Sequence, residues 1–283
     1  MELGNFKRKI VQFTAAVLTN ANLKGFIQGK IYKGNTKRIC IPGLNCYSCP
    51  GALGSCPIGS LQSVIGGKNY KFSYYILGFL IFFGALFGRF ICGWLCPFGL
   101  VQDLLYKISL PKVKISKRLQ ILKYLKYVIL LVFVIILPMF WVNSVGMGDP
   151  AFCKYICPAG TLEGGIPLVI MNKALRVSLG FLFKWKVTIL IINCILSIII
   201  FRPFCRFICP LGAIYSLFNP ISIYSYKVDS EKCTNCKICS SKCKLDIEVY
   251  KKPNSLECIR CGECIKACPQ NAIKVNFLTK NKE

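Results

Sequence analysis

Two cysteine runs stand near the end of the chain: Cys233-Thr-Asn-Cys-Lys-Ile-Cys-Ser-Ser-Lys-Cys243 and Cys258-Ile-Arg-Cys-Gly-Glu-Cys-Ile-Lys-Ala-Cys268-Pro269. Both follow the spacing Cys-x-x-Cys-x-x-Cys-x-x-x-Cys, so eight cysteines form two equivalent groups. Thiolates at this repeated spacing indicate a metal site, whereas disulfides or a cysteine-only zinc site are the alternatives. The sequence around them, from about Ile221, is lysine-rich and polar, which predicts a separate domain over residues 221–283.

The double spacing is that of bacterial ferredoxins with two [4Fe-4S] clusters, in which the fourth cysteine of each run binds the other cluster. This crossing ties the two runs into one α+β ferredoxin-like fold. We therefore assign one cluster to Cys233, Cys236, Cys239 and Cys268, and the second to Cys258, Cys261, Cys264 and Cys243.

The composition of the whole chain indicates a membrane protein. Of its 283 residues 54% are hydrophobic and 17% are charged, and the mean hydropathy is +0.52. The formal net charge of +26 counts cysteine as neutral. We read the basic excess as positive loops at a membrane and as partial neutralisation of anionic clusters, with no nucleic-acid partner.

The chain contains nineteen cysteines and no histidine. Without histidine, a bis-histidine haem b, a histidine-bound zinc and a Rieske centre are all excluded. Any bound redox metal must therefore rely chiefly on thiolates.

Apolar runs predict an α-helical membrane protein with about four transmembrane helices. The first run is short and diluted by polar residues, so an interfacial helix is its alternative. The loop Lys107–Lys126 is rich in basic residues and has no acidic one, which places it, and the ferredoxin domain with it, in the cytoplasm. The four runs are Ile10–Leu23, Phe72–Gly88, Tyr127–Gly148 and Val187–Phe201.

Residues 1–220 repeat the cassette Cys-Pro-x-Gly four times, beginning at Cys56, Cys96, Cys157 and Cys209. The flanks match in pairs, since Arg89 to Gly99 resembles Arg202 to Gly212. This pattern indicates an internal duplication, so we predict a membrane domain of two parallel repeats.

Proline suits the first turn of a helix, and a helix that follows each Cys-Pro would direct its positive end at the sulfur and lower the thiol pKa. Bringing the halves together predicts two sites, each suited to a further [4Fe-4S] cluster or to a tetrahedral zinc; disulfides and free thiols are the other interpretation. Cys46 is a replacement candidate in the irregular first cassette. The inner cysteines are Cys92, Cys96, Cys205 and Cys209, and the outer cysteines are Cys49, Cys56, Cys153 and Cys157.

The segment Gly88-Arg-x-x-Cys-Gly-Trp-Leu-Cys-Pro-x-Gly99, its partner Arg202–Gly212 and the ferredoxin domain resemble the NapH and NosR type of membrane iron-sulfur proteins over about residues 72–270. The resemblance implies a multi-pass protein of the cell membrane that transfers electrons between the quinone pool or a cytoplasmic donor and an acceptor across the membrane. It would act as the electron-transfer subunit of an oxidoreductase, beside a ferredoxin-like or reductase partner. A metal-handling protein, for example one that reduces copper or assembles a cofactor, and a redox sensor are the alternatives.

Overall fold

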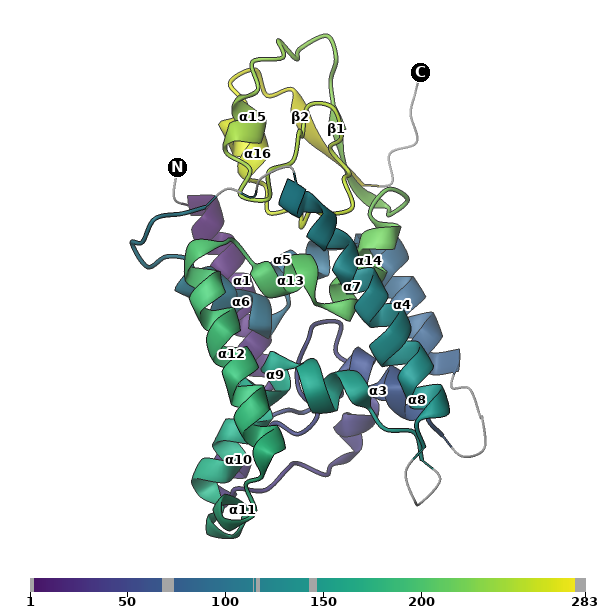
Figure 1. Cartoon of the computed structure of the whole chain (residues 1–283). Helices are drawn as coiled ribbons and strands as arrows, with labels where there is room; N and C mark the ends of the chain where they lie inside the picture. The colour runs from purple at the N-terminus through teal and green to yellow at the C-terminus, as the bar shows by residue number, and fades with distance from the viewer. Residues whose placement is uncertain (1–2, 68–73, 114, 116–117, 143–146, 278–283) are drawn as a thin grey trace.

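The computed structural model describes residues 3–67, 74–113, 115, 118–142 and 147–277. Helices dominate the chain, and one small sheet lies in the C-terminal part (Figure 1). Parts of three sequence predictions lie outside the described residues, namely the first residues of Phe72–Gly88, residues 143–146 of Tyr127–Gly148 and parts of Lys107–Lys126.

Long apolar helices form the periphery of the molecule. They are α1 (Leu3–Thr19), α4 (Tyr74–Phe87), a continuous helical stretch from η2 (Arg118–Tyr124) through α7 (Leu125–Ile129) and η3 (Leu130–Ile136) to α8 (Leu137–Phe140), and α12 (Phe181–Ile199). Within the described residues, two stretches are long and apolar enough to cross a membrane, Gln120–Phe140 and Phe181–Ile199. The prediction of four spans is therefore supported for two helices.

The first helix differs most from its prediction. It begins before Ile10, ends at Thr19 and includes the basic residues Lys7 to Lys9. The reason is that its polar side chains face inward: Arg8 donates to the Gly93 carbonyl at 3.1 Å, and Gln12 donates to the Cys96 carbonyl at 2.7 Å. Buried polar groups need such partners, so α1 is held by its polar face as well as by its apolar one.

Every Cys-Pro-x-Gly cassette begins a helix, as the sequence predicts. The cysteine is the N-cap residue and the proline occupies the first turn, where its missing N–H costs no hydrogen bond. The four helices are α3 (Pro57–Ile65), α6 (Pro97–Leu105), α9 (Pro158–Gly160) and α14 (Pro210–Phe218).

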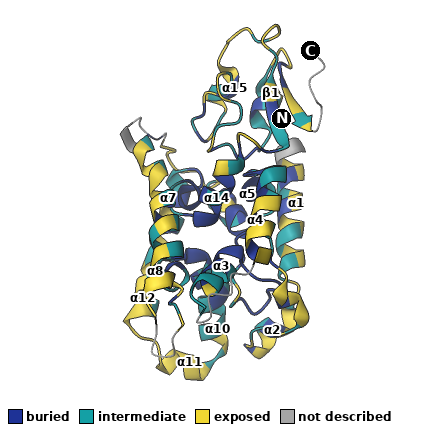
Figure 2. Cartoon of the chain, turned by 90° about the vertical axis from the view of Figure 1, so that its right-hand side faces the viewer, coloured by how far each residue is buried: buried dark blue, intermediate teal, exposed yellow. Residues whose placement is uncertain are grey.

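These helices lie at two levels inside the ring of apolar helices. Two short helices, α5 (Phe90–Trp94) and α13 (Pro203–Phe207), precede the inner cassettes. They lie side by side close to the C-terminal part, whereas α3 and α9 lie at the opposite level (Figure 1). Buried residues gather at this centre, and the outer faces of α4, α8 and α12 are exposed (Figure 2). The remaining short helices are α2 (Leu23–Gln28), η1 (Asn35–Arg38), η4 (Phe152–Ile156), η5 (Thr161–Gly165), α10 (Ile166–Met171) and α11 (Lys173–Val177).

The C-terminal part folds around a two-stranded sheet. Strand β1 (Tyr224–Val228) pairs antiparallel with β2 (Ile273–Phe277), so that Tyr224 faces Phe277 and Val228 faces Ile273. Both cysteine runs lie between these strands, together with α15 (Ile238–Ser241) and α16 (Glu263–Ala267). The strand pairing thus brings together the beginning and the end of the C-terminal part.

Buried ion pairs fasten the C-terminal part to the helices. The Glu257 carboxylate lies 2.6 Å from Arg89 and 2.5 Å from Lys126, and all three side chains are buried. Burial would raise the pKa of Glu257, but Arg89 and Lys126 outweigh it and hold that pKa below its usual range. Arg206 pairs with Asp246 at 3.2 Å, and Trp94 donates to the Arg260 carbonyl at 3.0 Å.

Replacing Glu257 should loosen this attachment. Glu257→Gln keeps the shape of the side chain and leaves two buried cations without its charge, which costs about 3–5 kcal/mol. We expect the C-terminal part to be released much faster in limited proteolysis. Glu248→Gln is the matched control, since Glu248 and Lys251 are 63% and 59% exposed and such pairs contribute at most about 1 kcal/mol. Equal protection in the two variants would contradict the role of Glu257.

Candidate functional site

Four cysteines of the C-terminal part lie next to the helical part, and we call them the proximal set: Cys243, Cys258, Cys261 and Cys264. Their sulfurs are electrostatic neighbours, meaning that they lie close enough for the charges of their thiolates to interact. A hollow beside this set is lined by Cys243 and Cys261 together with Arg8 and Phe201 of the helical part. The structure thus brings together the residues of the second predicted ligand set.

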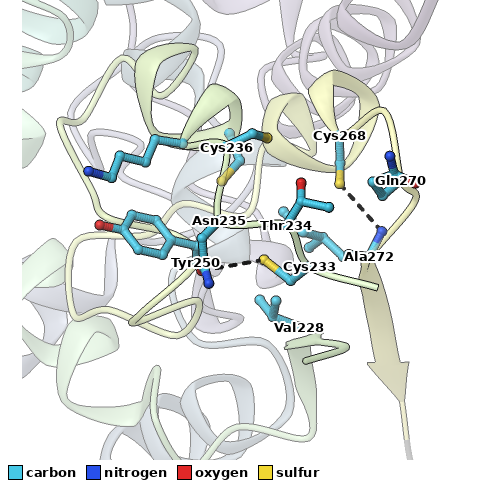
Figure 3. Close-up of a pocket in the computed structure, with 12 residues that line it drawn as sticks. Val228, Cys233, Thr234, Asn235, Cys236, Tyr250, Cys268, Gln270 and Ala272 are labelled. Atoms are coloured by element: carbon cyan, nitrogen blue, oxygen red, sulfur yellow. Dashed lines mark hydrogen bonds between the residues drawn. The ribbon is translucent and has the colours of Figure 1, made fainter. Parts of the chain in front are cut away.

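The distal set, Cys233, Cys236, Cys239 and Cys268, lines one hollow farther from the helices, with Tyr250 and Val228 beside it (Figure 3). The Ala272 N–H donates to the Cys268 sulfur at 3.4 Å (Figure 3). Cys236 is exposed at the surface. These are the residues of the first predicted set, and they come from both cysteine runs as the crossing pattern requires.

The inner cysteines Cys92, Cys96, Cys205 and Cys209 also lie together. All four are buried, and Cys209 has the other three as electrostatic neighbours. Cys92 and Cys205 belong to α5 and α13, whereas Cys96 and Cys209 are the N-caps of α6 and α14. Each half of the duplicated sequence therefore contributes two cysteines.

Two buried arginines join the halves reciprocally at this level. Arg89 donates to the Cys205 carbonyl at 2.8 Å, and Arg202 donates to the Cys92 carbonyl at 2.6 Å. Arg202 also makes two bonds to Asp103, at 2.6 and 2.7 Å. Both arginines are 1% exposed, so neither reaches out to a membrane surface.

The outer group contains Cys46 where the sequence suggested Cys49. The Cys46 sulfur is an electrostatic neighbour of Cys56, Cys153 and Cys157. The Cys49 sulfur also has Cys46 as an electrostatic neighbour, but it bonds to the Asn20 side-chain oxygen at 3.5 Å. The group that the structure brings together, called the revised outer set, is therefore Cys46, Cys56, Cys153 and Cys157.

Two glycines show that Cys46 and Cys153 hold equivalent places. A Cβ atom at Gly59 would lie 3.8 Å from the Cys153 sulfur and 3.9 Å from the Cys56 Cβ. A Cβ atom at Gly160 would lie 3.5 Å from the Cys46 sulfur and 3.8 Å from the Cys157 sulfur. The cassette glycines thus leave open the space beside the sulfurs.

The sixth residue after each cassette cysteine makes a contact that the sequence alone does not indicate, although its position can be read from the repeats. It is Gln62, Gln102, Glu163 or Tyr215, and each side chain reaches the other half of the molecule. Gln62 and Gln102 bond to Cys153 and Cys205, Glu163 accepts from the Cys46 N–H at 2.7 Å, and Tyr215 donates to the Pro42 carbonyl at 3.0 Å.

Burial reverses the predicted effect of the helix N-termini on the thiols. Desolvation raises the pKa of Cys56 to about 12, although the N–H groups of Gly59 and Ile58 act in the opposite direction. Burial and then the charge of Cys56 raise the pKa of Cys153 to about 12. Metal binding to these sulfurs must therefore displace protons.

Among the residues that the structure describes, no three Cys, Asp or Glu side chains converge closely enough to hold a single metal ion. The four cysteines of a [4Fe-4S] cluster bind different irons and so stand farther apart. All nineteen cysteines are free thiols, and backbone N–H groups face sulfurs at Cys157 and Cys209, at 3.4 and 3.3 Å.

The four sets follow one another through the molecule. Gly93 beside Cys92 abuts the segment Cys258–Cys261, because a Cβ atom there would lie 2.3 Å from the Ile259 carbonyl oxygen. Tyr215 is wholly buried and has Cys56 of the revised outer set as well as Cys92 and Cys96 as electrostatic neighbours. The order is distal, proximal, inner, outer.

Sequence comparisons agree with the cysteine chemistry. A family described as a 4Fe-4S binding domain matches residues 72–118, 126–166 and 186–222, and a second family of that description matches residues 252–274. No solved structure matches the chain at a significant level.

Relatives include an uncharacterized protein of Methanocaldococcus jannaschii, 30% identical over 69% of this chain and 67% of the relative. Ferredoxin-type protein NapH of Haemophilus influenzae is 28% identical over 69% of this chain and 64% of the relative. Regulatory protein NosR of Stutzerimonas stutzeri is 28% identical over 63% of this chain and 23% of its own length. The chain thus belongs to the NapH/NosR-type family of 4Fe-4S ferredoxin-type electron-transfer proteins.

Proposed function

We propose that the protein is an integral membrane electron carrier. It would transfer electrons between a cytoplasmic or quinone-pool partner and an acceptor across the membrane, by way of [4Fe-4S] clusters held in the four sets. The observation that carries this proposal is the succession of four four-cysteine groups, which runs from the C-terminal part into the helical part of the molecule. The similarity to NapH, a ferredoxin-type protein, supports an electron-transfer role with a redox protein partner.

Exposed apolar surface supports the membrane placement. Large apolar side chains cover the outer faces of α4, η3 and α12, among them Phe82, Leu131 and Ile192, which are 58%, 54% and 51% exposed. A soluble monomer rarely exposes so much contiguous apolar surface. We infer that α1 and α4 complete a four-helix membrane domain with the two longer stretches.

The basic loop between α6 and α7 supports the orientation. This loop and the C-terminal part lie at the same end of the molecule (Figure 1), and loops rich in Lys and Arg tend to stay in the cytoplasm. We infer that the distal set faces the cytoplasm, and that the revised outer set lies toward the other side. Cys236, which is exposed, then marks the face where a soluble partner docks.

The residues of the chain determine where such clusters could sit. Helix N-caps orient Cys56, Cys96, Cys157 and Cys209, and buried arginines hold the two halves together beside the inner set. When bound, the clusters would supply one-electron transfer. The closed packing around the inner and revised outer sets keeps water from their sulfurs, all but Cys46 and Cys153 being buried outright.

The content of iron and acid-labile sulfide tests the proposal. Full-length protein purified without oxygen should hold about sixteen iron atoms, four for each of four clusters. Changing Cys92 and Cys205 together to serine should remove about four of them, because one set loses two ligands. A wild-type value of about eight would contradict the membrane sites. Copper at the revised outer set without additional iron-sulfur EPR signals would favour the metal-handling alternative.

A pair of neighbouring cysteines tests the composition of the outer site. We expect Cys46→Ser to lower the iron content by up to four atoms, because the Cys46 sulfur lies with the other three members of the set. Cys49→Ser should retain the wild-type iron content, since the Cys49 sulfur faces Asn20. Iron analysis and EPR on both purified variants give the comparison. Iron loss in Cys49→Ser with retention in Cys46→Ser would restore the assignment suggested by sequence.

A further inference from the structure

Two buried glutamines occupy matching positions in the first half of the chain. We propose that Gln62 and Gln102 set the reduction potentials of the outer and inner sites, each by donating a hydrogen bond to one ligand sulfur. This inference rests on the proposed function and adds positioning residues that act on the cofactors through their ligands. Both side chains are 0% exposed.

The contacts of the two glutamines are the same. Gln102 donates through Nε2 to the Cys205 sulfur at 3.1 Å, and its Oε1 accepts from the Phe204 N–H at 3.2 Å. Gln62 donates through Nε2 to the Cys153 sulfur at 3.2 Å, and its Oε1 accepts from the Phe152 N–H at 3.0 Å. In each case, the side-chain amide on the helix after a first-half cassette donates to the cysteine that stands four residues before the matching cassette cysteine of the second half.

The backbone partner fixes which way each amide points. A backbone N–H can only donate, so it requires the oxygen of the glutamine. The NH₂ group is therefore directed at the sulfur, and it can only donate. The sulfurs of Cys153 and Cys205 must accept, which suits a thiolate bound to a metal.

The other two cassettes provide a contrast at the same position. Glu163 uses its carboxylate to accept from the Cys46 N–H, and Tyr215 directs its hydroxyl at the Pro42 carbonyl. Neither bond is made to a sulfur. In the described contacts, each membrane site thus receives its side-chain amide bond from the first half of the chain and on a cysteine of the second half.

Such a bond should raise the potential of its own site. Hydrogen bonds to ligand sulfurs are among the factors that set iron-sulfur potentials, and outer partners of metal ligands tune the metal they surround. The reduced cluster carries one more negative charge, so a donor stabilises it more than the oxidised form. Bonds to charged acceptors are about twice as strong as neutral ones, so a tenfold change in the reduction equilibrium is the expected scale.

The test is a redox titration of full-length protein followed by EPR. Gln62→Met and Gln102→Met keep the approximate volume of the side chain and remove the donor. Gln102→Met should lower the midpoint potential of the inner site by about 59 mV, which is a tenfold change for one electron, and leave the outer site unchanged. Gln62→Met should do the reverse. The signals are assigned by their loss in Cys205→Ser and in Cys153→Ser.

Gln12→Met is the matched control. Gln12 is equally buried, but it donates to the Cys96 carbonyl oxygen at 2.7 Å and not to a sulfur. Its substitution should change the reduction equilibrium of either site by much less than tenfold. If a methionine variant loses iron at its site, the leucine variant of the same residue is titrated in its place.

Unshifted potentials in variants that retain iron would overturn the inference, as would one substitution that shifts both sites equally. These outcomes differ from failure of the proposed function. A wild-type iron content of about eight removes the sites themselves, whereas the full content with unshifted potentials removes only the role of the glutamines.

Discussion

The reciprocal bonds of Arg89 and Arg202 are the contacts on which the architecture of the helical part depends. Each guanidinium is buried at the start of a short helix and donates to the carbonyl of a cysteine in the opposite half. A buried cation must have acceptors and a counter-charge, and here Glu257 and Asp103 provide the charges. The requirement leaves α5 and α13 little freedom to separate, and so it holds the inner cysteines together.

The same two arginines connect the cassette helices with the rest of the molecule. Arg89 pairs with Glu257, which immediately precedes Cys258 in the chain. Arg202 and Arg8 of α1 both pair with Asp103. The ion pairs are thus structural links between a site and its neighbours. Under the proposed function, these buried cations would lie beside anionic metal centres and stabilise them.

The sequence was sufficient for the features that depend on local spacing. The two cysteine runs predicted which cysteines of the C-terminal part lie together, and the Cys-Pro pairs predicted four helix N-termini. Both features follow from short-range geometry. It was insufficient where the outcome depends on tertiary burial. Cys46 is ten residues from Cys56, farther than Cys49, yet the loop between them turns the Cys46 sulfur toward the other half.

Burial also decided the other differences. Desolvation exceeds the influence of helix N-termini on the thiols, and a sequence pattern contains no measure of depth. The polar face of α1 packs inward because Arg8 and Gln12 find carbonyl partners more than eighty residues away, which apolar periodicity could not indicate. The position of the sixth residue after each cassette cysteine can be read from the repeats. Its hydrogen-bond partners cannot, because they belong to the opposite half of the chain.

Every set of four contains cysteines from separate segments of the chain, so each set becomes complete at a different point of synthesis. As the polypeptide leaves the ribosome, the revised outer set becomes complete at Cys157, the inner set at Cys209, the proximal set at Cys264 and the distal set at Cys268. That temporal order runs from one end of the folded molecule to the other. The cysteine set farthest from the C-terminal part is therefore the first for which synthesis supplies all four residues.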